Sequence, residues 1–91
     1  MNTDIIKNVL TKLATEGGYD QDLKDEVVFD DTHQRYMIIQ TGMDEDLPVF
    51  DVLVSVKVAG DKLIIEHVTL VEDFEELFSE AGITKENIIF K

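Results

Sequence analysis

The chain has 91 residues, a length that supports one hydrophobic core, so residues 1–91 are predicted to form a single domain. Its 20 acidic and 8 basic residues give a net charge of −12, which disfavours direct binding to nucleic acid phosphates. The absence of cysteine excludes disulfides, thiol catalysis and cysteine metal sites, and it fits a reducing cytoplasm. No apolar run reaches the roughly 18 residues of a membrane span, and residues 1–4 lack the features of a secretory signal.

Residues 3–16 are predicted to form an amphipathic helix. Thr3 is a favourable capping residue, and Asp4 suits the positive end of the helix dipole. Apolar side chains recur at helical spacing in one stripe: Ile5, Ile6, Val9, Leu10 and Leu13. Gly17 and Gly18 are expected to end this helix.

Two strands are expected next, over residues 26–30 and 34–41, where β-branched and aromatic residues concentrate. Residues 31–33 between them have turn composition and would make the two strands an antiparallel hairpin. Residues 19–25 are expected to be a polar connection. Residues 42–48, which contain the only proline, are expected to be a loop.

A long hairpin is predicted between Pro48 and Val68. Its first strand has the period-2 pattern of a half-buried strand, with one side formed by Phe50, Val52, Val54, Val56 and Val58. Gly60 and Asp61 suit a two-residue turn, because glycine tolerates the positive φ that such a turn requires.

That turn predicts the register of the hairpin, starting from a pair between Ala59 and Lys62. An unbroken register would place Leu53 opposite Val68 and turn His67 toward the apolar face, beside Val54. One face of the hairpin is almost wholly apolar and requires a covering layer.

A second helix follows the hairpin. Thr69 and Glu72 have the spacing of a capping box. Apolar residues then recur at helical spacing: Leu70, Val71, Phe74, Leu77, Phe78 and Ala81. Gly82 is expected to end the helix, and Ile83 to fold back on Phe78.

Residues 84–87 are predicted to form a turn and residues 88–90 a short last strand or an extended tail. The fold class is therefore α+β. We expect a mostly antiparallel sheet of about five strands with an N-terminal helix and a second helix after the long hairpin, both on one face.

The sequence offers no catalytic or metal-binding pattern. His33 falls in a predicted turn and is interpreted as a solvated side chain, and His67 as a neutral, hydrogen-bonded one. The acidic run at residues 44–46 is followed by Val49 and Ser55 where a calcium loop needs glycine and glutamate. We therefore expect no catalytic residue, metal or cofactor.

Several residue groups after Val28 occur together at a recognisable spacing: Phe29-Asp30, Tyr36, Gln40, Gly42-x-Asp44, Val49-Phe50, Val54-x-Val56-x-Val58, Lys62-Leu63-Ile64-Ile65 and Ala81-Gly82-Ile83-Thr84-Lys85-Glu86-Asn87-Ile88. In this combination the chain resembles the XisI family, the element-excision controlling factors of DNA rearrangement. It departs at Met43, where the family usually has Trp, and in the order of the turn residues Gly60-Asp61. It also ends at Lys91, before the family's usual C-terminal extension.

The resemblance implies an XisI-like fold and a regulatory protein without catalytic residues. It also implies action with an XisH-type, nuclease-like partner in the excision of a DNA element. The leading hypothesis is therefore a cytoplasmic, non-enzymatic protein that works through protein–protein contact. It would bind neither a membrane nor nucleic acid directly.

Two groups of residues are predicted to bind the partner. The first is apolar and is expected to form one outward patch, for a protein contact or a self-complementary dimer, unless another element of the chain covers it: Leu53, Ile64 and Val68. The second is acidic: Asp44, Glu45 and Asp46.

Two alternatives remain. The first is a nuclease inhibitor that mimics DNA, with a strongly salt-dependent docking charge supplied by Asp44, Glu45, Asp46, Glu72, Asp73, Glu75, Glu76 and Glu80. The second is a small hydrolase or metal enzyme that uses His67 with Glu66. Strand alternation disfavours it, because it places these neighbours on opposite faces.

Overall fold

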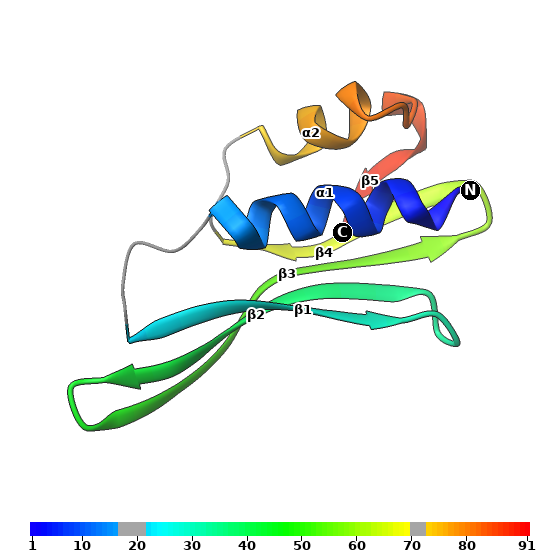
Figure 1. The fold of residues 1–91 in the computed structure, drawn as a ribbon. Coiled ribbons are helices and arrows are strands. Elements are labelled where there is room, and N and C mark those ends of the chain that lie inside the picture. The colour runs from blue at the N-terminus through cyan, green and yellow to red at the C-terminus, as the bar shows by residue number, and fades with distance from the viewer. Residues whose placement is uncertain (17–21, 70–72) are drawn as a thin grey trace.

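A computed structural model describes residues 1–16, 22–69 and 73–91. A five-stranded sheet, in the order β1-β2-β3-β4-β5, carries both α-helices of these residues on one face (Figure 1). The elements are α1 (Thr3–Glu16), β1 (Leu23–Asp30), β2 (Arg35–Asp44), β3 (Leu47–Ala59), β4 (Lys62–Val68), α2 (Phe74–Glu80), the 3₁₀ turn η1 (Lys85–Asn87) and β5 (Ile88–Phe90). Strands β1 to β4 pair antiparallel, and β5 pairs parallel with β4. The predicted α+β class is confirmed.

Helix α1 packs its apolar stripe on the sheet, as the 3.6-residue period requires. Ile6 and Leu10 are fully buried in the core. The cap of this helix is Asn2, whose Oδ1 accepts a hydrogen bond from the Asp4 N–H at 3.0 Å. The prediction that Thr3 caps the helix is therefore wrong, because Thr3 is already its first residue. The predicted end of the helix, at residues 17–18, lies outside the described residues. None of the described helices is long and apolar enough to span a membrane.

Strand β1 begins at Leu23, three residues before the predicted start at residue 26, because Leu23 pairs with Gly42 of β2. Polar side chains obscured this start, although backbone pairing at a sheet edge does not require apolar residues. Gly42 has φ 140°, and a Cβ there would lie 2.0 Å from the carbonyl oxygen of Asp22. The backbone at Gly42 lies so close to the Asp22 carbonyl that only glycine, which has no Cβ, fits at this position.

The predicted loop over residues 42–48 is wrong. Strands β2 and β3 remain paired to Asp44 and Leu47, and only Glu45 and Asp46 form the turn. Glu45 has φ 55°, a conformation that a tight hairpin turn requires. The loop was predicted because the whole segment is rich in turn-forming residues. Two residues are enough to reverse the chain, so the others can remain paired in the two strands. Residues 42–50, which we call the arm, project beyond the helices (Figure 1).

The predicted register of the β3–β4 hairpin holds from the turn as far as Val56. Beyond it, a β-bulge leaves Glu66 without an opposite residue, so His67 pairs with Ser55. The predicted pair of Val54 with His67 is therefore wrong. An extra residue in one strand changes the face on which the following side chains lie, and an alternating sequence does not show where such a residue falls.

A second bulge interrupts the pairing of β2 with β3 between Ile38 and Ile39, and Leu53 is the residue left without a partner. Val68 pairs with Val54, so the predicted pair of Leu53 with Val68 is also wrong. Both bulges lie in the middle of the sheet, where two ladders share β3.

The core lies between the sheet and the two helices. Its buried members are Ile6, Leu10, Tyr36, Ile38, Leu53, Val54, Val56, Val58, Leu63, Ile65, Phe74, Phe78 and Ile83. Two edge-to-face aromatic pairs contribute to the packing. Phe74 meets Phe78 at 5.0 Å between ring centroids, and Phe29 meets Tyr36 at 5.9 Å.

Helix α2 begins at Phe74, with Asp73 in the cap position. Thr69 instead continues the sheet: its N–H and its hydroxyl both donate to the Leu53 carbonyl, at 3.0 and 3.2 Å. The predicted capping role of Thr69 is therefore wrong. Its predicted companions Leu70, Val71 and Glu72 lie outside the described residues.

The end of α2 is as predicted. Gly82 has φ 116° and donates to the Ser79 carbonyl, and Ile83 donates to the Phe78 carbonyl at 3.0 Å. This bond pattern is a Schellman motif, which places Ile83 over the last turn of the helix. Ile83 is accordingly buried in the core.

Candidate functional site

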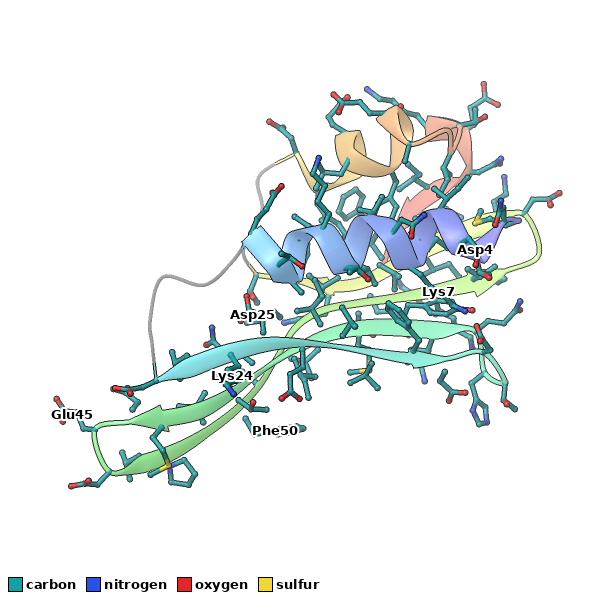
Figure 2. The ribbon with its side chains drawn as sticks, in the orientation of Figure 1. Asp4, Lys7, Lys24, Asp25, Glu45 and Phe50 are labelled. Carbon is teal, nitrogen blue, oxygen red and sulfur yellow. The ribbon has the colours of Figure 1, made fainter. Side chains whose placement is uncertain are left out.

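The side of the sheet away from the helices, which we call the outer face, has no covering layer among the described residues. In Figure 2, Lys24 and Phe50 point to this side, whereas Asp25 points toward α1. Strand alternation, corrected for the two bulges, places these apolar residues on the outer face: Val28, Met37, Ile39, Met43, Pro48, Phe50, Val52, Ile64 and Ile89. The sheet therefore presents apolar side chains on both faces, but only one face is packed by helices.

The arm carries the most exposed apolar side chains. Leu47 and Phe50 are each 71% exposed, and Met43 is 48% exposed. The three acidic residues predicted to bind a partner, Asp44, Glu45 and Asp46, are exposed together at the tip of the arm, and Figure 2 labels Glu45 there. Within the described residues, no three acidic or histidine side chains are grouped closely enough to hold a metal ion.

The predicted apolar patch of Leu53, Ile64 and Val68 does not exist as one surface. Leu53 is 6% exposed and belongs to the core, and Val68 packs against the same core. Ile64 alone lies on the outer face, where it is half-buried. The adjacency was predicted from an unbroken register, and the two bulges turn Leu53 and Val68 toward the helices.

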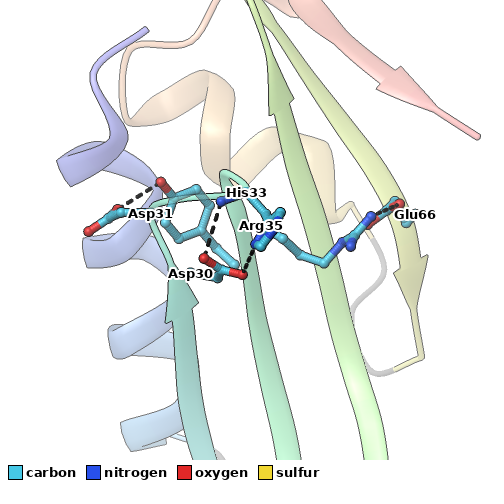
Figure 3. Close-up of polar contacts among 6 residues, drawn as sticks. Asp30, Asp31, His33, Arg35 and Glu66 are labelled. Atoms are coloured by element: carbon cyan, nitrogen blue, oxygen red, sulfur yellow. Dashed lines mark hydrogen bonds and ion pairs between the residues drawn. The ribbon is translucent and has the colours of Figure 1, made fainter.

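An ion pair lies on the outer face at the β4 bulge (Figure 3). Arg35 donates two hydrogen bonds to the Glu66 carboxylate, at 3.0 and 3.1 Å, and the Ser55 hydroxyl donates a third at 3.1 Å. The hydrogen bond from Arg35 and that from Ser55 lower the pKa of Glu66, although partial burial opposes them. The sequence pattern did not predict this cluster, because Arg35 and Glu66 lie 31 residues apart. They come into contact because the bulge at Glu66 places its carboxylate on the outer face.

His67 does not point toward the apolar face, as had been predicted. It is exposed and lines a shallow hollow on the outer face with Met37, Ser55 and Thr69. Because of the bulge, Glu66 and His67 lie on the same side of the sheet, so the alternation argument against a joint site is also wrong. The Glu66 carboxylate is nevertheless occupied by Arg35 and Ser55.

The β1–β2 turn holds a second polar cluster. The His33 side chain is exposed, as predicted, and its Nδ1 lies 2.7 Å from Asp30 Oδ2, an interaction that lowers the pKa of Asp30. Asp31 accepts hydrogen bonds from Lys7 at 3.0 Å and from Tyr36 at 2.9 Å, which lower the pKa of Asp31. These contacts attach α1 to the turn between β1 and β2.

Comparisons with known proteins agree with this architecture. The family model described as XisI protein matches residues 1–91. A crystal structure of an XisI-like protein from Anabaena variabilis superposes with a TM-score of 0.85 at 17% identity, covering 96% of this chain and 80% of that chain. The fdxN element excision controlling factor XisI from the same organism superposes with a TM-score of 0.77 at 20% identity, covering 94% of this chain and 84% of that one. A search of curated proteins found no match. Because the family match covers residues 1–91, the chain belongs to the XisI family and has the XisI-like fold.

Proposed function

We propose that this protein is a cytoplasmic accessory factor without catalytic residues of its own, which controls the excision of a DNA element by binding a nuclease-like protein of the XisH type. Membership of the XisI family supports this function, since one solved relative is an element excision controlling factor. The observation that carries the proposal is the arm, which presents Asp44, Glu45 and Asp46 away from the body of the molecule. An acidic tip of this kind suits a basic protein surface and favours rapid, oriented association.

The electrostatics of the ion pairs support a non-catalytic role. A general acid or base works best with a pKa close to the working pH, which for a carboxylate means a raised pKa. In this chain the pKa values of Asp30, Asp31 and Glu66 are all lowered, by His33, Lys7 and Arg35 respectively. Each of these carboxylates is therefore engaged by a neighbouring side chain and favours its ionised form, which supports a structural rather than a proton-transferring role.

The experiment compares two charge-neutralised variants for binding to a purified XisH-type partner. The tip variant carries Asp44→Asn, Glu45→Gln and Asp46→Asn, and the control carries Glu75→Gln and Glu80→Gln on α2. We expect the tip variant to bind about tenfold more weakly or worse, with a loss that shrinks as salt is raised, while the control keeps its affinity.

Other outcomes separate the alternatives. An equal loss in both variants would indicate an acidic surface spread over the arm and α2, as a DNA mimic requires. Unchanged affinity in both variants, or no complex at all with such a partner, would contradict the proposal.

A further inference from the structure

The outer face is nearly neutral although the chain as a whole is strongly acidic. In the strands that the structure describes, the charged side chains on this face are Lys24, Glu26, Asp30, Arg35, Lys57, Lys62 and Glu66. Four are basic and three acidic, whereas the chain has 8 basic and 20 acidic residues. Helix α1 has two acidic and two basic residues and is neutral overall, whereas α2 contributes Glu75, Glu76 and Glu80 and the arm tip Asp44, Glu45 and Asp46 to the net negative charge.

The charges on this face also neutralise one another locally. Arg35 is held by Glu66 through two hydrogen bonds, and Asp30 raises the pKa of the same guanidinium. Thr41 Oγ1 lies 3.5 Å from Glu26 on the same side. Pairs that are already satisfied within one chain lose less on burial than isolated charges do.

Apolar side chains on this face extend across the sheet. Val28 on β1 is 42% exposed, Met43 on β2 48%, Phe50 on β3 71% and Ile89 on β5 41%. Ile39 is only 8% exposed although it does not belong to the core beneath the helices. Some apolar area on the outer face is therefore already buried within the single chain. A face that carries exposed apolar side chains on β1, β2, β3 and β5 and has little net charge has the composition of a protein interface.

We propose that the outer face binds a second copy of this chain, so that two sheets pack face to face in a symmetric dimer. A symmetric interface must be complementary to itself, which a neutral, internally paired face satisfies and a strongly acidic one does not. A basic partner would instead gain its binding energy at the acidic helix α2 and at the arm tip. Two antiparallel sheets with apolar inner faces pack about 10 Å apart, as in a sandwich. This inference does not depend on the proposed function, because it is argued from the outer face of the sheet and not from the acidic tip of the arm.

The arm supplies a matched pair of variants. Phe50 and Leu47 lie on the same strand with the same exposure of 71%, but Phe50 points to the outer face and Leu47 to the opposite side. Sedimentation velocity of the full chain over a dilution series should show a dimer of the 10.3 kDa chain. Phe50→Asp should raise the dimer dissociation constant about tenfold or more, and Leu47→Asp should leave it unchanged. A wild-type chain that stays monomeric, or equal losses in both variants, would overturn the proposal.

Cysteine cross-linking provides a second measurement, because the chain has no cysteine of its own. Val28→Cys and Ile64→Cys should give cross-linked dimers with a bifunctional maleimide, whereas Asn8→Cys and Thr11→Cys on α1 should not. The dimer should also persist or strengthen as salt is raised, because screening weakens the repulsion between two chains of charge −12. Cross-linking through α1, or a dimer that dissociates in salt, would refute the outer-face interface. The contact of the arm tip with a nuclease-like partner weakens in salt, so the two proposals can fail separately.

Discussion

The two halves of the β2–β3 ladder have the same backbone pairing and very different surroundings. In the half beneath the helices, Tyr36, Ile38 and Val54 are each at most 3% exposed. In the arm, Leu47 and Phe50 are each 71% exposed. Backbone hydrogen bonds can extend a two-stranded ladder without any packing of side chains. Stability, however, depends on the apolar area removed from water, and a two-stranded ribbon alone is only marginally stable. The arm is therefore an extension of the sheet that the core does not stabilise.

A bulge marks the boundary between the two halves. The pairing shifts between Ile38 and Ile39, and the extra residue, Leu53, is buried under the helices. A bulge bends a strand and increases its twist. In Figure 1 the ladder leaves the helices near this point and the arm extends away from them.

The largest effect should come from shortening one leucine on each side of this boundary. Leu53→Ala should lower the free energy of unfolding by about 2–5 kcal/mol, because it leaves a cavity in the core. Leu47→Ala should change it by less than about 0.5 kcal/mol, because the side chain is exposed. Urea denaturation monitored by circular dichroism measures both. Similar losses in the two variants would contradict the contrast between the halves.

Amide hydrogen exchange tests the same contrast without a mutation. Amides of residues 43–47 and of Val49 should be at least about 100-fold less protected than those of Tyr36, Ile38 and Val56, because the arm can open locally without exposing the core. The measurement is made on dilute, monomeric protein. Uniform protection along the ladder would show that the arm opens only when the whole domain unfolds.

Gly42 is the residue at the root of the arm, and Gly60 is its matched control. Gly42→Ala should cost about 2 kcal/mol or more, because the added Cβ meets the Asp22 carbonyl at 2.0 Å and the residue must keep a positive φ. Gly60 also has a positive φ, of 63°, but nothing lies within 4 Å of its added Cβ, so Gly60→Ala should cost only about 1 kcal/mol. Thermal unfolding of the two variants gives the difference. Equal costs would argue against the close approach of the two strands at Gly42.

The smallest effect concerns the ion pair of Arg35 with Glu66. It lies outside the arm, on the outer face of the part of the sheet that packs against the helices. Because folding lowers the pKa of Glu66, its contribution to stability is present above the pKa of the unfolded chain, about 4.3, and disappears as the pH falls through the folded value. Glu66→Gln should therefore cost no more than about 1 kcal/mol at pH 7, and this cost should vanish in acid.

Urea denaturation at pH 7 and at about pH 3 measures this dependence. Glu86→Gln, an exposed position on η1, is the control and should differ little from the wild type at either pH. A cost of Glu66→Gln that is the same at both pH values would show that the carboxylate charge does not contribute.

The sequence by itself determined the elements that local chemistry encodes. The apolar stripe of α1, the Gly60 turn and the glycine end of α2 each depend on residues within a few positions of one another, and each agrees with the structure. The acidic residues Asp44, Glu45 and Asp46 were assigned to a loop, whereas Asp44 is paired in β2, and their role in binding a partner stays a prediction. The α+β class followed from the order of these elements.

Only the tertiary structure decided which strand side chains point inward. Along an unbroken alternation every register is locally equivalent, so the positions of the two extra residues depend on how the sheet fits under α1 and α2. These bulges bury Leu53 in the core, pack Val68 against it and bring Glu66 to Arg35. The start of β1 and the length of the arm were decided in the same way, because they depend on backbone pairing between distant segments rather than on the polarity of the side chains.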